Sequence, residues 1–154
     1  MLLPAAAALL LVSLAAARVQ AAPQPLPDEV SDVQWHVATT IFGDFTCRGL
    51  QDVAMFGVSE KSGFVVVVQP RGKASKASYL SFASRGRDPA NMRLTAESLD
   101  LLTNDEESKR QQEYLPRDLK ASKTCKGLAF GDGETDSHHI YWSRDKKVLR
   151  AWSL

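Results

Sequence analysis

Hydrophobic and polar residues alternate in the first stretch that can form a regular element. Between Val33 and Phe42 the apolar positions are Val33, Trp35, Val37 and Ile41, and Gln34, His36 and Thr40 lie between them. Successive side chains of a strand point to opposite faces, so this period of two predicts a strand with one buried face. Gly43 and Asp44 end it.

Two apolar runs without alternation follow. They extend from Val53 to Val58 and from Phe64 to Val68, and the four residues from Glu60 to Gly63 between them fit a hairpin turn. Branched side chains suit a pleated sheet, so the valine-rich second run predicts a central strand. With a further strand at Tyr79–Phe82, these runs predict an antiparallel meander.

The period changes after this meander. Asp88 is a good helix cap with Pro89 at the first helical position. Met92, Ala96, Leu99 and Leu102 recur at spacings of four, three and three. This spacing predicts a helix with one apolar face. Thr103 and Glu106 have the spacing of a capping box, which predicts a second, polar helix over Asn104–Tyr114.

The last part of the chain returns to strands. His138–Trp142 and Val148–Trp152 flank a four-residue turn and predict a hairpin. We therefore expect a mainly β fold: a small antiparallel barrel or sandwich of five to seven strands, with one or two helices inserted at about 89–115.

The beginning of the chain has the pattern of an export signal. Residues Met1 to Ala17 are almost wholly apolar, and Val19-Gln20-Ala21 has the small-x-small pattern of a cleavage site. We expect cleavage after Ala21, with Ala17 as the second choice and an uncleaved membrane anchor as the alternative. The prediction is thus a signal peptide at 1–21, a proline-rich extended lead-in at 22–31, a single β-rich domain at 32–154, and secretion.

The two cysteines of the chain lie in similar stretches, Thr46–Leu50 and Thr124–Leu128. Two cysteines in an exported chain usually pair. Neither has a CxxC partner, which argues against a metal site or a redox pair. We therefore predict a Cys47–Cys125 disulfide; over 78 positions (125 minus 47) it stabilises the fold by about 4–5 kcal/mol in the chain-entropy model.

Charge excludes some functions. Without residues 1–21, which contain Arg18, 18 basic residues face 18 acidic ones, so the net charge is zero. General binding of nucleic acid or of anionic membranes needs a strongly basic surface. After the signal, no apolar run is long enough to span a membrane.

No motif predicts catalysis, a metal or a cofactor. Asp132-x-Glu134-x-Asp136 begins like a calcium loop, but Ser137 and Ser143 stand where that loop needs glycine and glutamate. A hydrolase would use His36, His138 or His139, but no Gly-x-Ser-x-Gly elbow is present. The chain is therefore predicted not to be an enzyme.

Basic residues gather in turns. They are Arg71, Lys73 and Lys76, then Arg85 and Arg87, and later Lys120, Lys123 and Lys126. If the turns at 71–76 and 85–87 share one end of the meander, they form a surface for an acidic partner such as a sulfated glycan. The dibasic pair Lys109-Arg110 is a candidate processing site of a secreted precursor.

Large apolar residues provide an alternative kind of site. Trp35, Phe56, Val66 and Trp142 are candidates for the lining of an apolar pocket, although a packed core uses the same residue types. Size, export and strand count resemble those of lipocalin-type ligand carriers, whose Gly-x-Trp motif would need glycine where Val33 stands. We therefore predict a secreted binding protein whose partner is a protein or a small apolar ligand; the oligomeric state is left open.

Overall fold

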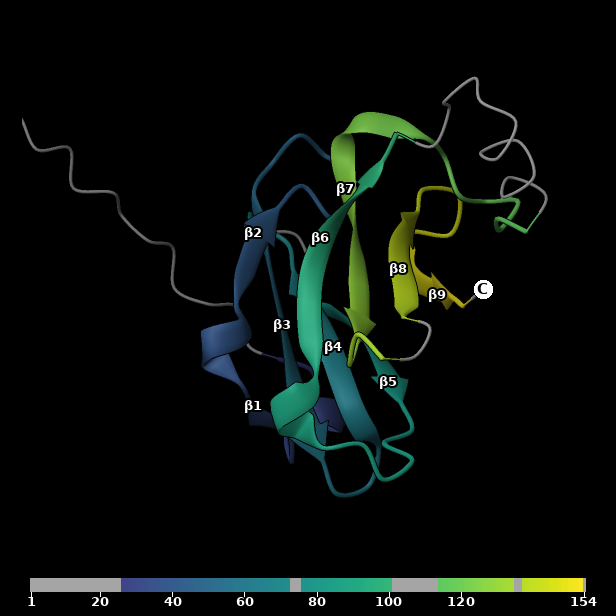
Figure 1. The fold of residues 1–154 in the computed structure, drawn as a ribbon. Helices are drawn as coiled ribbons and strands as arrows, with labels where there is room; N and C mark the ends of the chain where they lie inside the picture. Colours follow the sequence, from purple (N-terminus) through teal and green to yellow (C-terminus); the bar gives the residue numbers. More distant parts are fainter. Residues whose placement is uncertain (1–25, 73–75, 101–113, 135–136, 154) are drawn as a thin grey trace, which may run out of the picture.

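The fold consists of two antiparallel sheets packed face to face, as a computed structural model shows (Figure 1). The structure describes residues 26–72, 76–100, 114–134 and 137–153. The first sheet contains β1 (Gln34–Trp35), β2 (Ile41–Gly43), β3 (Asp52–Ser59), β4 (Gly63–Gln69) and β5 (Ser78–Phe82). The second contains β6 (Arg93–Leu99), β7 (Ser122–Gly131), β8 (His138–Ser143) and β9 (Val148–Trp152). The predicted mainly β fold is confirmed and is the sandwich of the two predicted alternatives, with nine strands in the described part of the chain against the five to seven expected.

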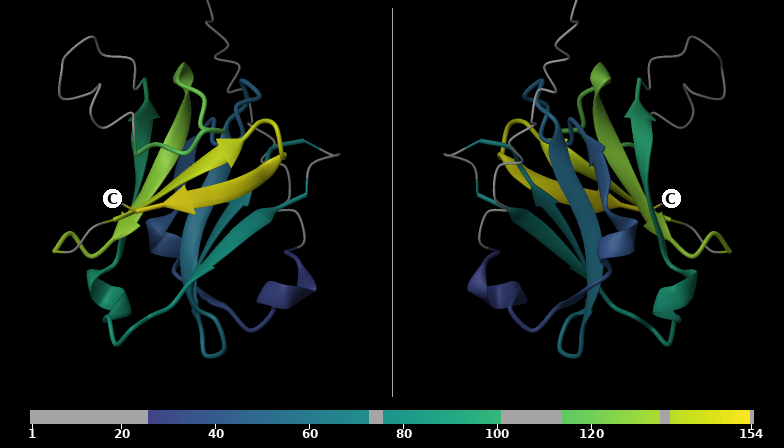
Figure 2. Two further views of the ribbon diagram at one scale, coloured as in Figure 1. Left: turned by 90° about the vertical axis from the view of Figure 1, so that its right-hand side faces the viewer. Right: turned by 90° about the vertical axis from the view of Figure 1, so that its left-hand side faces the viewer.

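The two sheets meet along their edges in an order that differs from the chain order. β2 lies against β6, and β5 lies against β9 (Figure 2). The connection from β5 to β6 therefore runs from one edge of the sandwich to the other. An up-and-down barrel of the carrier type places each strand beside its neighbour in the chain. Here β5 and β6 are not paired, so the sandwich has a different strand order.

The strand directions place the connections at two ends of the sandwich. One end contains the β2–β3, β4–β5 and β8–β9 connections and the start of β7 (Figure 1). The opposite end contains the β3–β4, β5–β6 and β7–β8 connections. This division decides which loop residues lie close together, because antiparallel strands alternate in direction.

Aromatic and branched side chains fill the space between the sheets. Phe56, Phe64 and Phe130 are fully buried, and the ring centroid of Phe130 lies 5.3 Å from that of Phe56 and 5.6 Å from that of Phe64. The inward-facing residues of the valine run, Val66 and Val68, pack in the same cluster. Val65 faces the other way and packs under Val30 and Val33 of the N-terminal segment. The run is therefore buried on both faces, as its lack of alternation predicted.

The predicted helix after Asp88 is wrong. Asp88 does cap a helical turn, accepting a 2.9 Å hydrogen bond from the Ala90 backbone N–H, but this 3-10 turn, η3, ends after Pro89–Asn91. The chain then continues as strand β6. The helix-like spacing arose because Met92 closes the turn, Ala96 is exposed on the strand, and Leu99 follows a register shift after Ser98. The second predicted helix, Asn104–Tyr114, lies outside the described residues except for Tyr114.

Two other elements differ from the prediction. The strand predicted at 33–42 is divided into β1 and β2 by a second 3-10 turn, η2 (Val37–Thr39). Strand β7 was not predicted, because its glycines at 127 and 131 interrupt the apolar pattern. The hairpins β3–β4 and β8–β9 are confirmed at the predicted positions.

Candidate functional site: a basic end of the sandwich

Two aspartates hold the loop between β2 and β3 by accepting hydrogen bonds from it. Asp44 accepts hydrogen bonds of 2.9 Å from the backbone N–H groups of Arg48 and Gly49. Asp52 is fully buried and accepts from Thr46 through both its backbone N–H (2.8 Å) and its hydroxyl (2.7 Å). A buried carboxylate is tolerated only when donors satisfy it in this way. The two acidic side chains thus serve the loop and do not face a partner.

A disulfide joins this loop to the second sheet. Cys47 is bonded to Cys125 near the start of β7, with the Cα atoms 4.8 Å apart, which confirms the predicted pairing. The backbone beside it also connects the sheets, because the Lys126 N–H donates to the Asp44 carbonyl at 2.9 Å. Cys47 has a φ of 57°, a left-handed conformation that the loop imposes on a residue other than glycine.

A third carboxylate holds the segment that leads into β7. Asp118 accepts hydrogen bonds from the hydroxyl groups of Tyr141 (2.6 Å) and Ser143 (2.7 Å), and from the Arg150 guanidinium (3.1 Å). The bonds from Tyr141 and Ser143, and the nearby Arg150 charge, lower the pKa of Asp118 to about 2. The segment therefore lies on the outer face of the second sheet, fixed by a carboxylate that stays ionised.

The basic side chains at this end remain at the surface. Besides Arg48, which is exposed but bonded within the β2–β3 loop, eight exposed basic residues lie here: Arg71, Lys76, Arg117, Lys120, Lys123, Arg144, Lys146 and Lys147. Among the described residues, the exposed acidic groups at the same end are Asp100 and Asp145. We call this surface the basic end. Among the described residues at this end, exposed basic groups therefore outnumber exposed acidic groups, because the other carboxylates accept hydrogen bonds that hold loops.

Arg85 and Arg87 do not belong to this surface. They follow β5, whereas Arg71 and Lys76 precede it, so strand β5 separates the two predicted groups and places them at opposite ends. Arg87 instead approaches Asp132, with 3.6 Å between Nε and Oδ2. Lys73 lies outside the described residues. The groups that do share an end are Arg71 with Lys76, the 117–123 segment and the β8–β9 turn.

Sequence reasoning missed the basic residues of the β8–β9 turn. The sequence pattern places Arg144 and Lys146 in the four-residue turn of the predicted hairpin and assigns no role to Lys147. Without strand β7, however, the sequence pattern does not show that this turn lies at the same end of the sandwich as Arg71 and Lys76.

The adjacent histidines lie on opposite faces of the second sheet. His138 stacks on Phe82 and its Nδ1 is 2.9 Å from the Ser153 hydroxyl, while burial and the charges of Arg87 and Arg85 lower its pKa. His139 stacks on Trp152, and its Nδ1 is 2.8 Å from Oε2 of Glu97. Burial raises the pKa of Glu97, and the contact with His139 partly opposes this.

Aromatic rings cover both histidines, Phe82 at His138 and Trp152 at His139. In the described part of the chain, Glu97 Oε1 and Trp152 Nε1 are buried side-chain atoms without a hydrogen-bond partner. Glu97 is admitted beside His139 because Gly127, on the strand between them, has no side chain. The arrangement joins β6 to β8 across β7.

The four candidate pocket residues do not surround one space. Phe56 and Val66 are buried in the core between the sheets, and Trp142 packs partly buried against the same cluster. Trp35 packs with Val30, Val33 and Val65 in the separate cluster on the outer face of the first sheet. Gly57 permits that packing, because a Cβ atom there would lie 2.5 Å from Val33.

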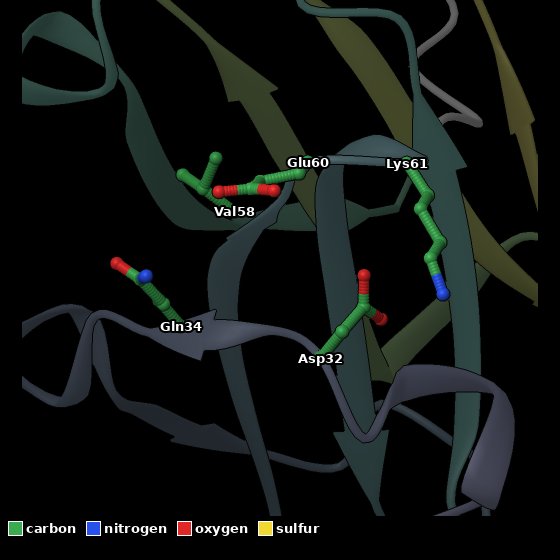
Figure 3. Close-up of a pocket in the computed structure, with 5 residues that line it drawn as sticks. All are labelled: Asp32, Gln34, Val58, Glu60 and Lys61. Atoms are coloured by element: carbon green, nitrogen blue, oxygen red, sulfur yellow. The ribbon is translucent and has the colours of Figure 1, made fainter.

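A partly open pocket of about 420 Å³ lies near the opposite end of the sandwich (Figure 3). It is lined by Asp32, Gln34, Val58, Glu60 and Lys61. Asp32 accepts a 2.8 Å hydrogen bond from Ser59, and four of the five lining residues are exposed. The pocket is a shallow depression beside the β3–β4 hairpin and contains none of the predicted site residues.

Fold and site together define an antiparallel β-sandwich with an intersheet disulfide and a basic end. Among the residues that the structure describes, no three or more His, Cys, Asp or Glu are grouped so that they could hold a metal ion. The described ranges contain no helix with the length and apolar character needed to cross a membrane. In comparisons with protein-family models, with curated proteins and with solved structures, no significant match to the chain was found.

Proposed function

We propose that the protein is an exported binding domain that receives an acidic partner on its basic end. The observation that carries the proposal is the separation of charge at that end. Asp44, Asp52 and Asp118 are used by internal hydrogen bonds, while eight exposed lysines and arginines face solvent. Complementary charge of this kind directs an anionic partner to one surface.

Export is supported by the apolar leader and by the disulfide. Disulfides persist in oxidising compartments and are rare in the cytosol. The Cys47–Cys125 bond is consistent with a domain that works after passage through the secretory pathway. Detection of the chain in culture medium, beginning at Ala22, tests this part of the proposal.

Binding on a surface is better supported than carriage or catalysis. Among the candidate lining residues, Phe56 and Val66 are fully buried by other core side chains. These two residues therefore provide no surface for contact with a small apolar ligand. His138 and His139 have hydrogen-bond partners but lie under Phe82 and Trp152, and neither lines the pocket near Asp32.

The test is retention on an anionic matrix, measured as the salt concentration that elutes the protein. Lys146→Ala/Lys147→Ala removes two charges from the basic end. Lys61→Ala/Arg85→Ala removes two charges from the opposite end, and each pair contains one residue of positive φ, Lys147 at 55° and Arg85 at 48°. We expect earlier elution of the first variant only. Equal elution of both variants, or no retention of the unmodified chain at low salt, would overturn the proposal.

A further inference from the structure

We infer that the partner of the basic end is a linear sulfated polysaccharide; this rests on the proposed function and specifies its partner. The exposed basic groups are spread over separate connections of the sandwich: the β4–β5 turn, the segment before β7 with the start of that strand, and the β8–β9 turn. A single carboxylate or phosphate meets only one of these. A long polyanion can contact several of them together.

The kind of basic residue favours a polyelectrolyte over a folded protein. Five of the eight exposed basic residues are lysines: Lys76, Lys120, Lys123, Lys146 and Lys147. Lysine is depleted in protein–protein interfaces, where arginine and aromatic residues are enriched. Its ammonium is a hydrated point charge on a flexible stem, which suits many weak contacts with repeated anionic groups.

Arg48, in the β2–β3 loop at this end, is bonded within the protein. The guanidinium of Arg48 donates to the Thr46 hydroxyl (2.9 Å), to Asp52 Oδ1 (3.2 Å) and to the Arg71 carbonyl (3.0 Å). It therefore holds the β2–β3 loop and does not offer its fork to a carboxylate of a protein partner. Recognition of an acidic peptide by a fixed, bidentate arginine is correspondingly disfavoured at this position.

Asp145, which lies beside Lys120, does not prevent a polyanion from binding there. Lys120 Nζ is 3.9 Å from Asp145 Oδ2, and the two side chains are 51% and 63% exposed. A surface pair of this kind contributes about 0–1 kcal/mol and is screened by salt. A polyanion with several sulfates can replace Asp145 beside Lys120. The exposed apolar residues at this end are Leu50, Tyr114 and Val148. Each lies in or beside a different connection, so they are separate in the chain.

The experiment compares three probes on the oxidised chain without its signal. They are heparin oligosaccharides, the same oligosaccharides after removal of sulfate, which keep their carboxylates, and poly-glutamate of matched charge. We expect heparin to bind at least about tenfold more tightly than either other probe, with a log K that falls steeply with log salt, as for binding by counterion release. Lys146→Ala/Lys147→Ala should reduce the salt slope by about one to two, whereas Lys61→Ala/Arg85→Ala should leave it unchanged.

The outcomes separate the two levels of the proposal. Equal or tighter binding of poly-glutamate would assign the basic end to an acidic polypeptide; the inference would fail and the proposed function would stand. Failure of every probe to bind at low salt would overturn both. Equal loss of heparin binding in the two double variants would overturn the assignment of the site, since circular dichroism and thermal unfolding of each variant establish that it is folded.

Discussion

The Asp118 carboxylate, in the segment before β7, accepts a 2.6 Å hydrogen bond from the Tyr141 hydroxyl in β8. Tyr141 is buried, and burial together with this bond raises the pKa of its phenol. The same carboxylate also accepts from Ser143 and Arg150, so one acidic group connects the segment to two strands. Lys120 lies two residues after this anchor, which makes Asp118 a positioning residue for part of the basic end.

Asp118→Asn should lower the free energy of unfolding at pH 7 by about 1–3 kcal/mol, because it weakens three hydrogen bonds to a charged acceptor. The folded-state pKa of about 2 lies below the ordinary value of 3.8. The carboxylate therefore stabilises the fold above pH 4, and this contribution is lost as the pH falls toward 2. Urea unfolding over that range should show the two proteins converge. The exposed Asp145→Asn should change stability by less than about 0.5 kcal/mol.

Replacement of both cysteines, Cys47→Ser/Cys125→Ser, should destabilise the fold by about 4–5 kcal/mol in the chain-entropy model. Cys125 lies in β7, which is paired on both sides, so its strand keeps its hydrogen-bonded neighbours when the disulfide is absent. Hydrogen exchange of the reduced chain should therefore rise first in the loop at 44–51. Earlier exchange in β8 and β9 would contradict this order.

Gly127→Ala should destabilise the sandwich by about 1–3 kcal/mol through overpacking. A Cβ atom at this position would lie 2.9 Å from Leu99 Cδ2, 3.0 Å from the Ile140 carbonyl oxygen and 3.1 Å from Glu97 Cγ. It would also displace Glu97 from His139, so the pKa of the Glu97 carboxyl should change in an NMR titration. Ala151→Ser, at an exposed position of β9, is the matched control.

Arg87→Ala should raise the pKa of His138. Burial lowers this pKa below the ordinary value of 6.5, and the Arg87 charge is the next cause, followed by Arg85 and His139. Because the lowered pKa favours the neutral ring in the folded state, the contribution of His138 to stability decreases as the pH falls below 6.5. NMR titration of the imidazole measures the shift. Arg93→Ala, which removes an arginine that bonds to the Ala90 and Met92 carbonyls, should leave His138 unchanged.

The strands that the sequence predicted correctly are those whose hydrophobic pattern follows directly from which of their faces are buried. The valine run became β4 because both of its faces are covered, by the core and by the N-terminal segment. β6 could not be recognised in the same way. Its buried Leu94 and Leu99 are separated by a register shift, and the intervening Ala96 is exposed, so no period of two survives.

The candidate site was predicted in composition but not in grouping. Arg71 and Arg85 are fourteen positions apart with one strand between them. A pattern along the chain indicates that both lie in turns, but the end at which each turn lies depends on the strand count. The hydrogen bonding of Asp44, Asp52 and Asp118 is a tertiary property as well, because each carboxylate depends on donors that the folded backbone and neighbouring strands supply.

The Cys47–Cys125 bond also sets an order of assembly during synthesis. Cys47 leaves the ribosome 78 residues before Cys125, which corresponds to roughly 4–16 s at about 5–20 residues per second. In that interval Cys47 has no cysteine of its own chain as a partner, since the sequence contains two. If the first sheet forms in this interval, it does so with Cys47 as an open thiol, and an early disulfide of Cys47 can form only with another molecule. The intramolecular bond can form only after the β7 residue Cys125 has come into contact with the β2–β3 loop of the first sheet.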